Sequence, residues 1–163
     1  MFKAIWKLGA HDIELAKSIR RAVFIEEMGL PESEVFDARD AYSAHLEVFE
    51  EDTLEPIATA RMYPDFARDN CDCCAVPATH IGEIAVMKQY RDTNQYYDFA
   101  LRMLLYKAQS LSGQKLVADI FPSELPFYEA FGFKSTDENT TAGKIRVAVD
   151  KEKVRMQGEC HTN

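Results

Sequence analysis

The sequence lacks any apolar run long enough to cross a membrane, and its first residues contain no signal-peptide hydrophobic region. We therefore expect a cytoplasmic protein. Basic residues are in the minority, because 19 Lys and Arg stand against 27 Asp and Glu, which gives a net charge of −8 and a pI near 5.0. Such a surface repels nucleic acid and anionic lipid, so neither is expected as a partner. It mildly favours a cationic small molecule, such as an amine.

Cysteine is scarce, and three of the 4 cysteines lie close together. Cys71, Cys73 and Cys74 precede His80, and Cys160 lies near the end of the chain. Thiolate and imidazole groups are good zinc ligands, but the spacing Cys-x-Cys-Cys is not the usual Cys-x2-Cys, and no second pair follows. We favour reduced thiols in an exposed loop and expect no metal. Stoichiometric zinc in protein purified without chelator would overturn this interpretation.

What is present is an ordinary globular composition, with 47% hydrophobic and 28% charged residues. The length of 163 residues is enough to bury a core, and we expect a single domain over residues 1–150 and a polar tail over 151–163. Hydrophobic periodicity predicts helices over residues 13–28, 97–111 and 123–131. It predicts strands over residues 2–8, 45–49, 57–63, 81–87, 115–121 and 145–149.

This order of elements predicts an α/β fold. Antiparallel strands come first, and a strand–helix–strand unit over residues 81–121 joins two parallel strands. We therefore expect a mixed, mostly antiparallel sheet with a central parallel crossover, flanked by helices.

The most informative stretch is the junction between the strand at 81–86 and the helix that follows it. A short β-branched run breaks into the polar turn 87–96, and this turn opens a long amphipathic helix. Backbone N–H groups at the start of a helix bind phosphate and other anions. Lys88 and Arg91 add positive charge to the turn, whereas Asp92 opposes it. The junction therefore predicts an anion site.

Three stretches together carry a family resemblance. The first, Arg-Arg-Ala-Val-Phe-Ile-Glu-Glu-Met-Gly-Leu-Pro over residues 20–31, leads into an acidic loop with Glu34, Asp37 and Asp40, then His45. The second is the strand and turn 81–96. The third is Leu-Pro-Phe-Tyr-Glu-Ala-Phe-Gly-Phe over residues 125–133. In this order and at these separations, residues 13–133 resemble the GCN5-related N-acetyltransferase (GNAT) family.

The resemblance implies a transferase that moves an acetyl group from acetyl-CoA directly to the amine of a small molecule. In that family the pantetheine arm of CoA lies beside a strand that here ends at Val86, and the pyrophosphate lies on the turn that follows. The cofactor-binding residues implied by the resemblance are Ile84, Val86, Met87, Arg91, Thr93, Asn94, Gln95 and Tyr96.

The resemblance also suggests catalytic and substrate-binding residues. Tyr128 matches a tyrosine that protonates the departing thiolate, and its alternative is a packed aromatic residue. Glu83 lies on the central strand, where a carboxylate could take the amine proton, or could form a structural ion pair with Arg61 or Arg91. Glu26 and Glu27 end the first helix and could attract a cationic acceptor, although such a pair is more often a solvated face.

The turn departs from the family pattern at two positions, because Asn94 and Tyr96 stand where the family has Gly and then Gly or Ala. Three functions therefore remain open. We favour an acetyl-CoA-dependent acyltransferase with a divergent turn. The second is an N-acyl synthase that takes its acyl chain from acyl carrier protein, of the acyl-homoserine-lactone or N-acyl amino acid type. The third is a non-catalytic binding module. A homodimer through edge strands also stays open.

Overall fold

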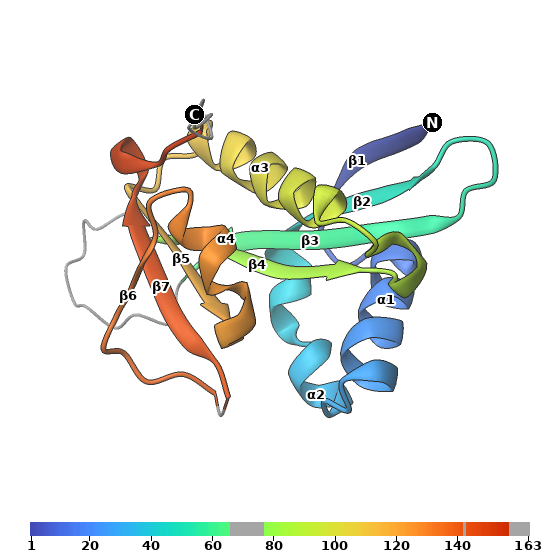
Figure 1. The fold of residues 1–163 in the computed structure, drawn as a ribbon, viewed down its shortest axis with the longest axis horizontal. Coiled ribbons are helices and arrows are strands. Elements are labelled where there is room, and N and C mark those ends of the chain that lie inside the picture. Colours follow the sequence, from blue (N-terminus) through green and yellow to red (C-terminus); the bar gives the residue numbers. More distant parts are fainter. Residues whose placement is uncertain (66–76, 142, 157–163) are drawn as a thin grey trace. The chain divides into compact units, whose positions relative to one another are not determined.

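The protein is built on a seven-stranded sheet with the strand order β1-β2-β3-β4-β5-β7-β6 (Figure 1). The structure, a computed structural model, describes residues 1–65, 77–141 and 143–156. β4 and β5 pair in parallel, whereas β1–β2, β2–β3, β5–β7 and β6–β7 pair antiparallel. The predicted mixed α/β architecture is thus confirmed. The strands are β1 (Phe2–Leu8), β2 (Ala44–Glu50), β3 (Pro56–Pro64), β4 (Thr79–Val86), β5 (Lys115–Ile120), β6 (Lys134–Ser135) and β7 (Ile145–Asp150).

The chain divides into two compact units, and the divisions fall inside β3, β4 and α3. The first unit comprises Met1–Tyr63 and Ile81–Leu104, and the second comprises Pro64–His80 and Leu105–Asn163. The α-helices are α1 (Glu14–Arg20), α2 (Glu32–Val35), α3 (Gln95–Gln109) and α4 (Leu125–Glu129), with the π-helix η1 (Arg21–Glu27) following α1. The short 3-10 turns are η2 (Ala38–Tyr42), η3 (Lys88–Tyr90), η4 (Pro122–Glu124) and η5 (Lys151–Lys153).

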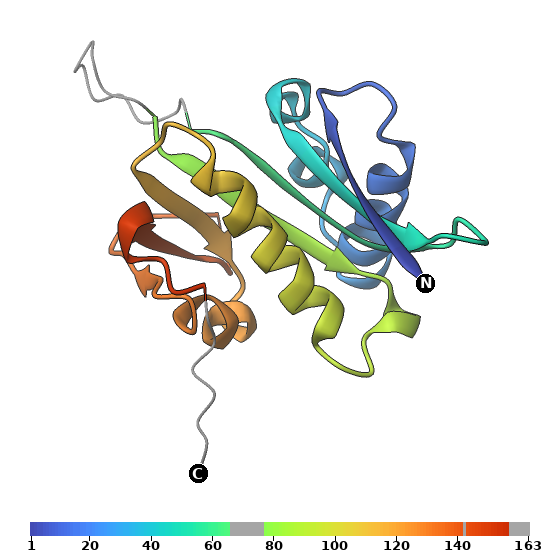
Figure 2. The same cartoon turned by 90° about the horizontal axis from the view of Figure 1, so that it is seen from above.

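In the first unit, helices lie on both faces of an antiparallel sheet. β1 pairs with β2 along its whole length, from Phe2 opposite Glu50 to Leu8 opposite Ala44. β2 and β3 form the adjacent hairpin, with a register shift at Val48. α1 and α2 lie on one face of these strands and the first turns of α3 on the other (Figures 1 and 2). Both faces are therefore covered, which explains why β2 and β3 are almost continuously buried.

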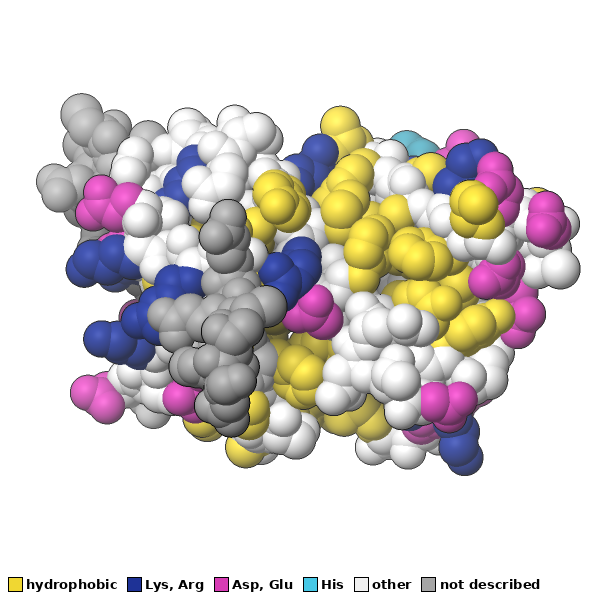
Figure 3. Space-filling view, turned by 45° about the horizontal axis from the view of Figure 1, so that its top comes forward, with side chains coloured by type: hydrophobic (Ala, Val, Ile, Leu, Met, Phe, Trp, Pro, Cys, Tyr) yellow, Lys and Arg dark blue, Asp and Glu magenta, His cyan; other side chains and the backbone are white. Residues whose placement is uncertain are grey.

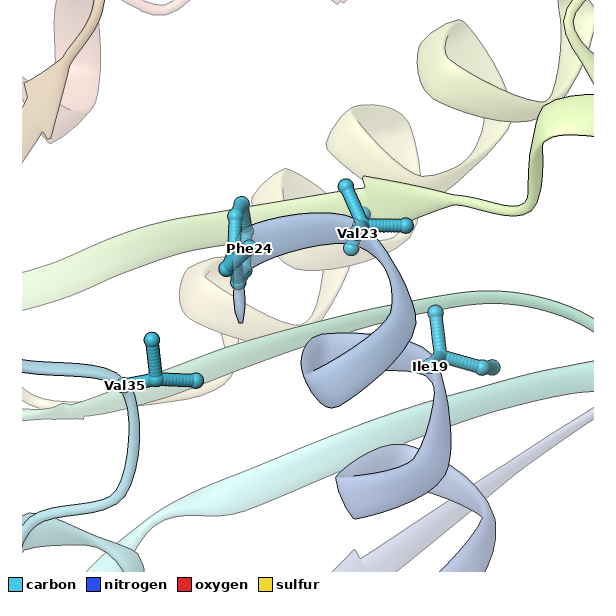
Figure 4. Packing of buried hydrophobic residues seen from close by; sticks show 5 residues of the cluster. Ile19, Val23, Phe24 and Val35 are labelled. Carbon is cyan, nitrogen blue, oxygen red and sulfur yellow. The ribbon is translucent and has the colours of Figure 1, made fainter. Parts of the chain in front are cut away.

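A hydrophobic cluster fixes α1 and η1 against β4. Ile19, Val23 and Phe24 lie on the side of the helix turned toward the sheet, and Val35 joins them from α2 (Figure 4). Ala85 of β4 completes the cluster. Burying a side chain of this size stabilises a fold by about 1.5–3 kcal/mol. The cluster therefore fixes the position of the residues that follow Ile19 in sequence.

The helix predicted over residues 13–28 forms, but its second half has a different geometry. α1 ends at Arg20 and the chain continues as the π-helix η1, in which Met28 N–H donates to Val23 O at 3.2 Å. Val23 and Phe24, two consecutive residues of this segment, are both buried. Gly29, with φ of 74°, ends the segment as expected. π-helical turns are frequent at functional sites.

The second unit is organised around β7. β5 pairs with β7 from Lys115 opposite Asp150 to Ile120 opposite Ile145, and the two-residue β6, which was not predicted, pairs on its other side. The helix predicted over residues 123–131 is the short turn η4 followed by α4. The parallel ladder between β4 and β5 comprises Thr79 opposite Leu116 and His80 opposite Val117, although β4 continues to Val86.

Two sequence expectations concern membranes and metals. In the described part of the chain, no helix has both the length and the apolar character needed to span a membrane. Within these same residues, no three His, Cys, Asp or Glu side chains are grouped in a way that could hold a metal ion. Cys71, Cys73, Cys74 and Cys160 lie outside the described residues, so the interpretation of the cysteines stays a prediction.

Candidate active site

Glu83 lies at an irregular point in the middle of β4. Gly82 has φ of 142° and Glu83 has φ of 45°, so two successive residues leave the extended conformation of a strand. A side-chain-bearing residue in the left-handed region costs about 1–3 kcal/mol and persists only where its surroundings impose it. Such strain is concentrated at functional sites. The Glu83 side chain is 23% exposed, whereas its neighbours Gly82 and Ile84 are buried.

Arg61 of β3 holds the Glu83 carboxylate in place. Its Nε donates to Glu83 Oε2 at 2.8 Å and its Nη2 to Glu83 Oε1 at 3.2 Å. The same guanidinium donates to both oxygens of Asp37, from Nη1 and Nη2 at 2.9 Å each. Only 2% of the Arg61 side chain is exposed. A buried guanidinium with two bidentate partners fixes the orientation of both carboxylates.

Asp40 connects Arg61 to a second buried arginine. Asp40 Oδ1 accepts from Arg61 Nη1 at 2.8 Å, and both Asp40 oxygens accept from Arg20 of α1 at 3.0 Å. Arg20 Nη1 also donates to Val35 O at 3.3 Å. The five side chains come from α1, β3, β4 and the segment around η2, and we call them the Arg61 cluster: Arg20, Asp37, Asp40, Arg61 and Glu83.

The pKa values follow from burial and from these contacts. Burial alone would lower the pKa of Arg61, but the charges of Glu83 and Asp37 and their hydrogen bonds raise it well above its usual value. Burial would raise the pKa of Asp37, but the Arg61 hydrogen bond and charge hold it below its usual range. Burial, and then the charge of Glu83, raise the pKa of Tyr63, whose ring lies 5.1 Å from the Arg61 guanidinium carbon. Arg61 and Asp37 therefore both stay ionised at neutral pH.

His45 borders the cluster from β2. Its Nε2 lies 3.2 Å from the backbone oxygen of Asp40 and 3.9 Å from the Asp40 carboxylate. Burial lowers the pKa of His45, a shift that the contacts with Asp40 partly offset and that the charges of Arg20 and Arg61 reinforce. His45 is therefore neutral at neutral pH and acts as a packed neighbour of the cluster.

Two carboxylates of the cluster reach solvent. Glu83 is 23% exposed and Asp37 is 21% exposed, while Arg20, Asp40 and Arg61 are almost fully buried. Arg61 donates one hydrogen bond to each oxygen of the Glu83 carboxylate, and the exposed part of this side chain is accessible to a bound amine. The cluster can thus orient a carboxylate for proton transfer.

The end of β4 is tied to η1 through Arg91. Arg91 Nη1 and Nη2 donate to the Glu27 carboxylate at 2.8 and 2.9 Å. Arg91 Nε donates to Val86 O at 2.7 Å. The hydrogen bond from Arg91, more than its charge, lowers the pKa of Glu27. Of the two glutamates predicted to attract an acceptor, Glu27 is therefore ion-paired, whereas Glu26 is exposed.

Comparison with protein-family sequence profiles finds no match for this chain. Solved structures do match it. An acyl-CoA N-acyltransferase from Pseudomonas aeruginosa is 15% identical with a TM-score of 0.71, covering 91% of this chain and 99% of its own. FeeM, an N-acyl amino acid synthase from uncultured soil microbes, is 16% identical with a TM-score of 0.71, and the match covers 93% of this chain and 92% of FeeM. The GNAT domain of S. lividans PAT is 16% identical with a TM-score of 0.60, covering 90% of each chain.

This protein has the GNAT fold. The assignment rests on structural likeness over about the whole chain, and it agrees with the resemblance seen in the sequence. At these identities the likeness establishes the fold.

Within the GNAT fold, β4 was predicted to offer backbone groups to the donor's arm. Ile84 and Val86 are buried on β4, and both lie beyond the ladder with β5, which ends at His80. The Val86 oxygen already accepts from Arg91, and Met87 N–H donates to Ile57 O at 2.8 Å. The N–H of Met87 and the oxygen of Val86 therefore both already make hydrogen bonds within the first unit.

The turn after β4 reaches α3 without a left-handed residue. Among the described non-glycine residues, positive φ occurs at Asp12, Leu54 and Glu83, so Asn94 does not adopt it. Thr93, Asn94 and Gln95 are exposed, and Asn94 O accepts from Asp98 N at 2.9 Å as α3 begins. The turn therefore forms without the conformational freedom that glycine supplies.

Tyr96 packs toward β1. Its ring makes edge-on contacts with Phe2 at 5.5 Å and with Tyr90 at 5.6 Å, and Phe2 also contacts Phe99 at 5.1 Å. Hydrophobic side chains gather over β1 and the start of α3 on this face of the first unit (Figure 3). Phe2 is 41% exposed. The bulky residue at the family's small-residue position is thus accommodated in an aromatic cluster.

Tyr128 lies in α4 of the second unit. Its side chain is fully buried, and its ring meets Phe133 edge-on at 5.2 Å. This packing is the alternative considered for Tyr128 in the sequence. The role of Tyr128 as an acid stays a prediction.

Sequence reasoning missed Arg20, Asp37, Asp40 and most of the significance of Arg61. Two signals were available. Arg61 interrupts an otherwise apolar strand, and Asp37 and Asp40 follow at a spacing of three in an acidic loop. A charged residue within a buried strand needs a partner of opposite charge. The sequence does not reveal which carboxylates supply it, because they are separated from Arg61 by more than 20 positions along the chain.

Proposed function

We propose that this protein transfers an acyl group, in the first instance acetyl from acetyl-CoA, to the amine of a small molecule. The observation that carries the proposal is Glu83, a carboxylate held by a buried arginine at a strained position of β4 in a GNAT fold. The negative charge of the protein favours an amine acceptor over nucleic acid or an anionic membrane as partner.

Glu83 is proposed as the base. The neutral amine attacks the carbonyl carbon of the thioester, and the Glu83 carboxylate takes the amine proton directly or through one water. The carbon–sulfur bond then breaks and the sulfur leaves as a thiolate. Tyr128 is proposed to protonate this thiolate. The products are an amide and free CoA. Arg61 acts as a positioning residue, because it orients the Glu83 carboxylate.

The turn 91–96 and the start of α3 are proposed to receive the donor's phosphates. Lys88 and Arg91 supply positive charge and the first N–H groups of α3 supply hydrogen-bond donors. Ile84 and Val86 are proposed to pair with the pantetheine arm through their backbone groups. Thr93, Asn94 and Gln95 are exposed, as such contacts require.

The test is a thiol-release assay with acetyl-CoA and a panel of small amines. We expect amine-dependent release of CoA by the natural protein and at least a tenfold lower rate for Glu83→Gln, with unchanged CoA affinity, because general base catalysis contributes about 10²–10⁴. Glu51→Gln is the matched control, since this exposed carboxylate pairs with Lys3 at 3.1 Å outside the Arg61 cluster. An equal rate for Glu83→Gln and the natural protein would exclude Glu83 as the base.

A second function, carrier-protein-dependent N-acyl synthesis, is favoured by one observation. The guanidinium of Arg91, which would meet the CoA pyrophosphate, is already paired with Glu27. A phosphopantetheine arm carries less phosphate charge and depends less on that arginine. FeeM, named as an N-acyl amino acid synthase, matches the fold as well as the acyl-CoA enzyme does. Binding of acyl carrier protein without binding of CoA would support this function, and binding of neither would support a non-catalytic module.

A further inference from the structure

The Glu27–Arg91 pair lies where the proposed function places a phosphate. Both guanidinium Nη atoms of Arg91 point to the Glu27 carboxylate, at 2.8 and 2.9 Å, and Nε is held by Val86 O at 2.7 Å. The guanidinium therefore presents its two-donor edge to an anion that belongs to the protein itself. Carboxylate and phosphate both fit this edge with paired hydrogen bonds, so they compete for it.

The pair is exposed enough to open. Arg91 is 39% exposed and Glu27 is 33% exposed. Ion pairs of this exposure contribute little to stability, about 0–1 kcal/mol, so an incoming phosphate can displace the carboxylate at small cost. The bond from Nε to Val86 O can remain, because it uses a different edge of the guanidinium. Lys88 is also near enough for its charge to lower the pKa of Glu27, so the local field favours an anion.

We propose that Glu27 is an internal competitor for the donor's phosphate: it occupies Arg91 in the free protein and must leave when the acyl donor binds. This inference rests on the proposed function. It makes Glu27 a residue that tunes donor affinity, and it replaces the expectation that Glu27 attracts a cationic acceptor.

The experiment compares the binding of CoA and of pantetheine, which lacks phosphate, by calorimetry. The variants are Glu27→Gln, the matched control Glu32→Gln, and Arg91→Gln with and without Glu27→Gln. Glu32 is a suitable control because it also pairs with an arginine of η1, Arg21, at 3.0 Å and is exposed. We expect Glu27→Gln to bind CoA about fivefold more tightly, with no change for Glu32→Gln. Pantetheine affinity should be the same in all variants.

The Arg91→Gln background separates competition from a general change in charge. If Glu27 acts by occupying Arg91, Glu27→Gln gives no gain once Arg91 has been replaced. An unchanged CoA affinity for Glu27→Gln, an equal gain for pantetheine, or a gain that persists without Arg91 would each overturn the inference and leave the proposed function standing. Failure of the natural protein to bind either ligand would instead overturn the proposed function, and this inference with it.

Discussion

Glu83 combines an unfavourable backbone conformation with two hydrogen bonds from a buried arginine. At the scale of single residues this combination separates it from the other candidate carboxylates. Glu26 is exposed and Glu27 is occupied by Arg91. The sequence offered Glu83 as a base or as the partner of Arg61 or Arg91 in an ion pair. The ion pair with Arg61 is present, and the role of Glu83 as a base stays a prediction. Its positive φ could not be predicted, because Glu rarely adopts that conformation and nothing local in the chain requires it.

Tyr128 is the second residue with a testable role. We expect Tyr128→Phe to lower turnover at least about tenfold while CoA affinity is kept, because phenylalanine packs in the same volume but cannot donate a proton. The measurement is kcat for thiol release. Tyr106→Phe is the control, since Tyr106 is 64% exposed. A near-normal kcat for Tyr128→Phe would leave Tyr128 with a packing role alone.

At the scale of elements, the Arg61 cluster joins β3, β4, α1 and the loop before β2. Its carboxylates would lose their main partner in Arg61→Ala, and breaking a buried ion pair from one side costs about 3–5 kcal/mol. We expect a loss of that size in the free energy of unfolding, measured with urea. Arg102→Ala is the control, because the Arg102–Asp98 pair of α3 is partly exposed and such pairs contribute about 0–1 kcal/mol. Equal losses in the two variants would show that the cluster does not connect these elements.

His45, beside the Arg61 cluster, makes the free energy of unfolding depend on pH. Its pKa is lower in the folded protein than in the unfolded chain, so the unfolded chain binds more protons as the pH falls below about 6.5. The contribution of neutral His45 is therefore present above that pH and is lost on acidification toward its folded pKa. We expect the free energy of unfolding to fall more between pH 7.5 and 5.5 in the natural protein than in His45→Gln.

The control for this measurement is His11→Gln, because His11 is exposed. His11→Gln should keep the natural pH dependence. The quantity compared is the change in the free energy of unfolding between pH 7.5 and 5.5, so a destabilisation of His45→Gln that is equal at both pH values does not affect the result. The same pH dependence in all three proteins would contradict the proposed role of burial at His45.

Element prediction from the sequence succeeded where hydrophobic period and turn residues agreed. In the described part of the chain, every strand of five residues or more was found, with boundaries within two residues, because alternating or continuous apolar runs bounded by turn residues mark such strands. The change from the α-helix α1 to the π-helix η1 was not predicted. The hydrogen bonds of the two helix types differ in spacing by only one residue, and the apolar pattern of this segment is compatible with both. β6 was missed because two polar residues, Lys134 and Ser135, carry no pattern.

At the scale of the whole molecule, the order of elements was enough to predict the fold, whereas function depends on contacts that sequence order conceals. The Arg61 cluster brings together side chains from positions 20 to 83. The turn after β4 shows a related limit. Asn94 and Tyr96 stand where the family has glycine or alanine, yet Asn94 needs no left-handed conformation and the Tyr96 ring packs against Phe2. Residue identity alone did not fix the shape of the turn.

The central claim is that this fold binds an acyl-thioester donor through CoA. Calorimetric titration of the natural protein with CoA tests it most directly, with pantetheine and acyl carrier protein titrated in parallel. The account predicts one CoA site with a dissociation constant in the micromolar range, which corresponds to about −8 kcal/mol. A folded protein that does not bind CoA would contradict it, whether or not it binds pantetheine or acyl carrier protein.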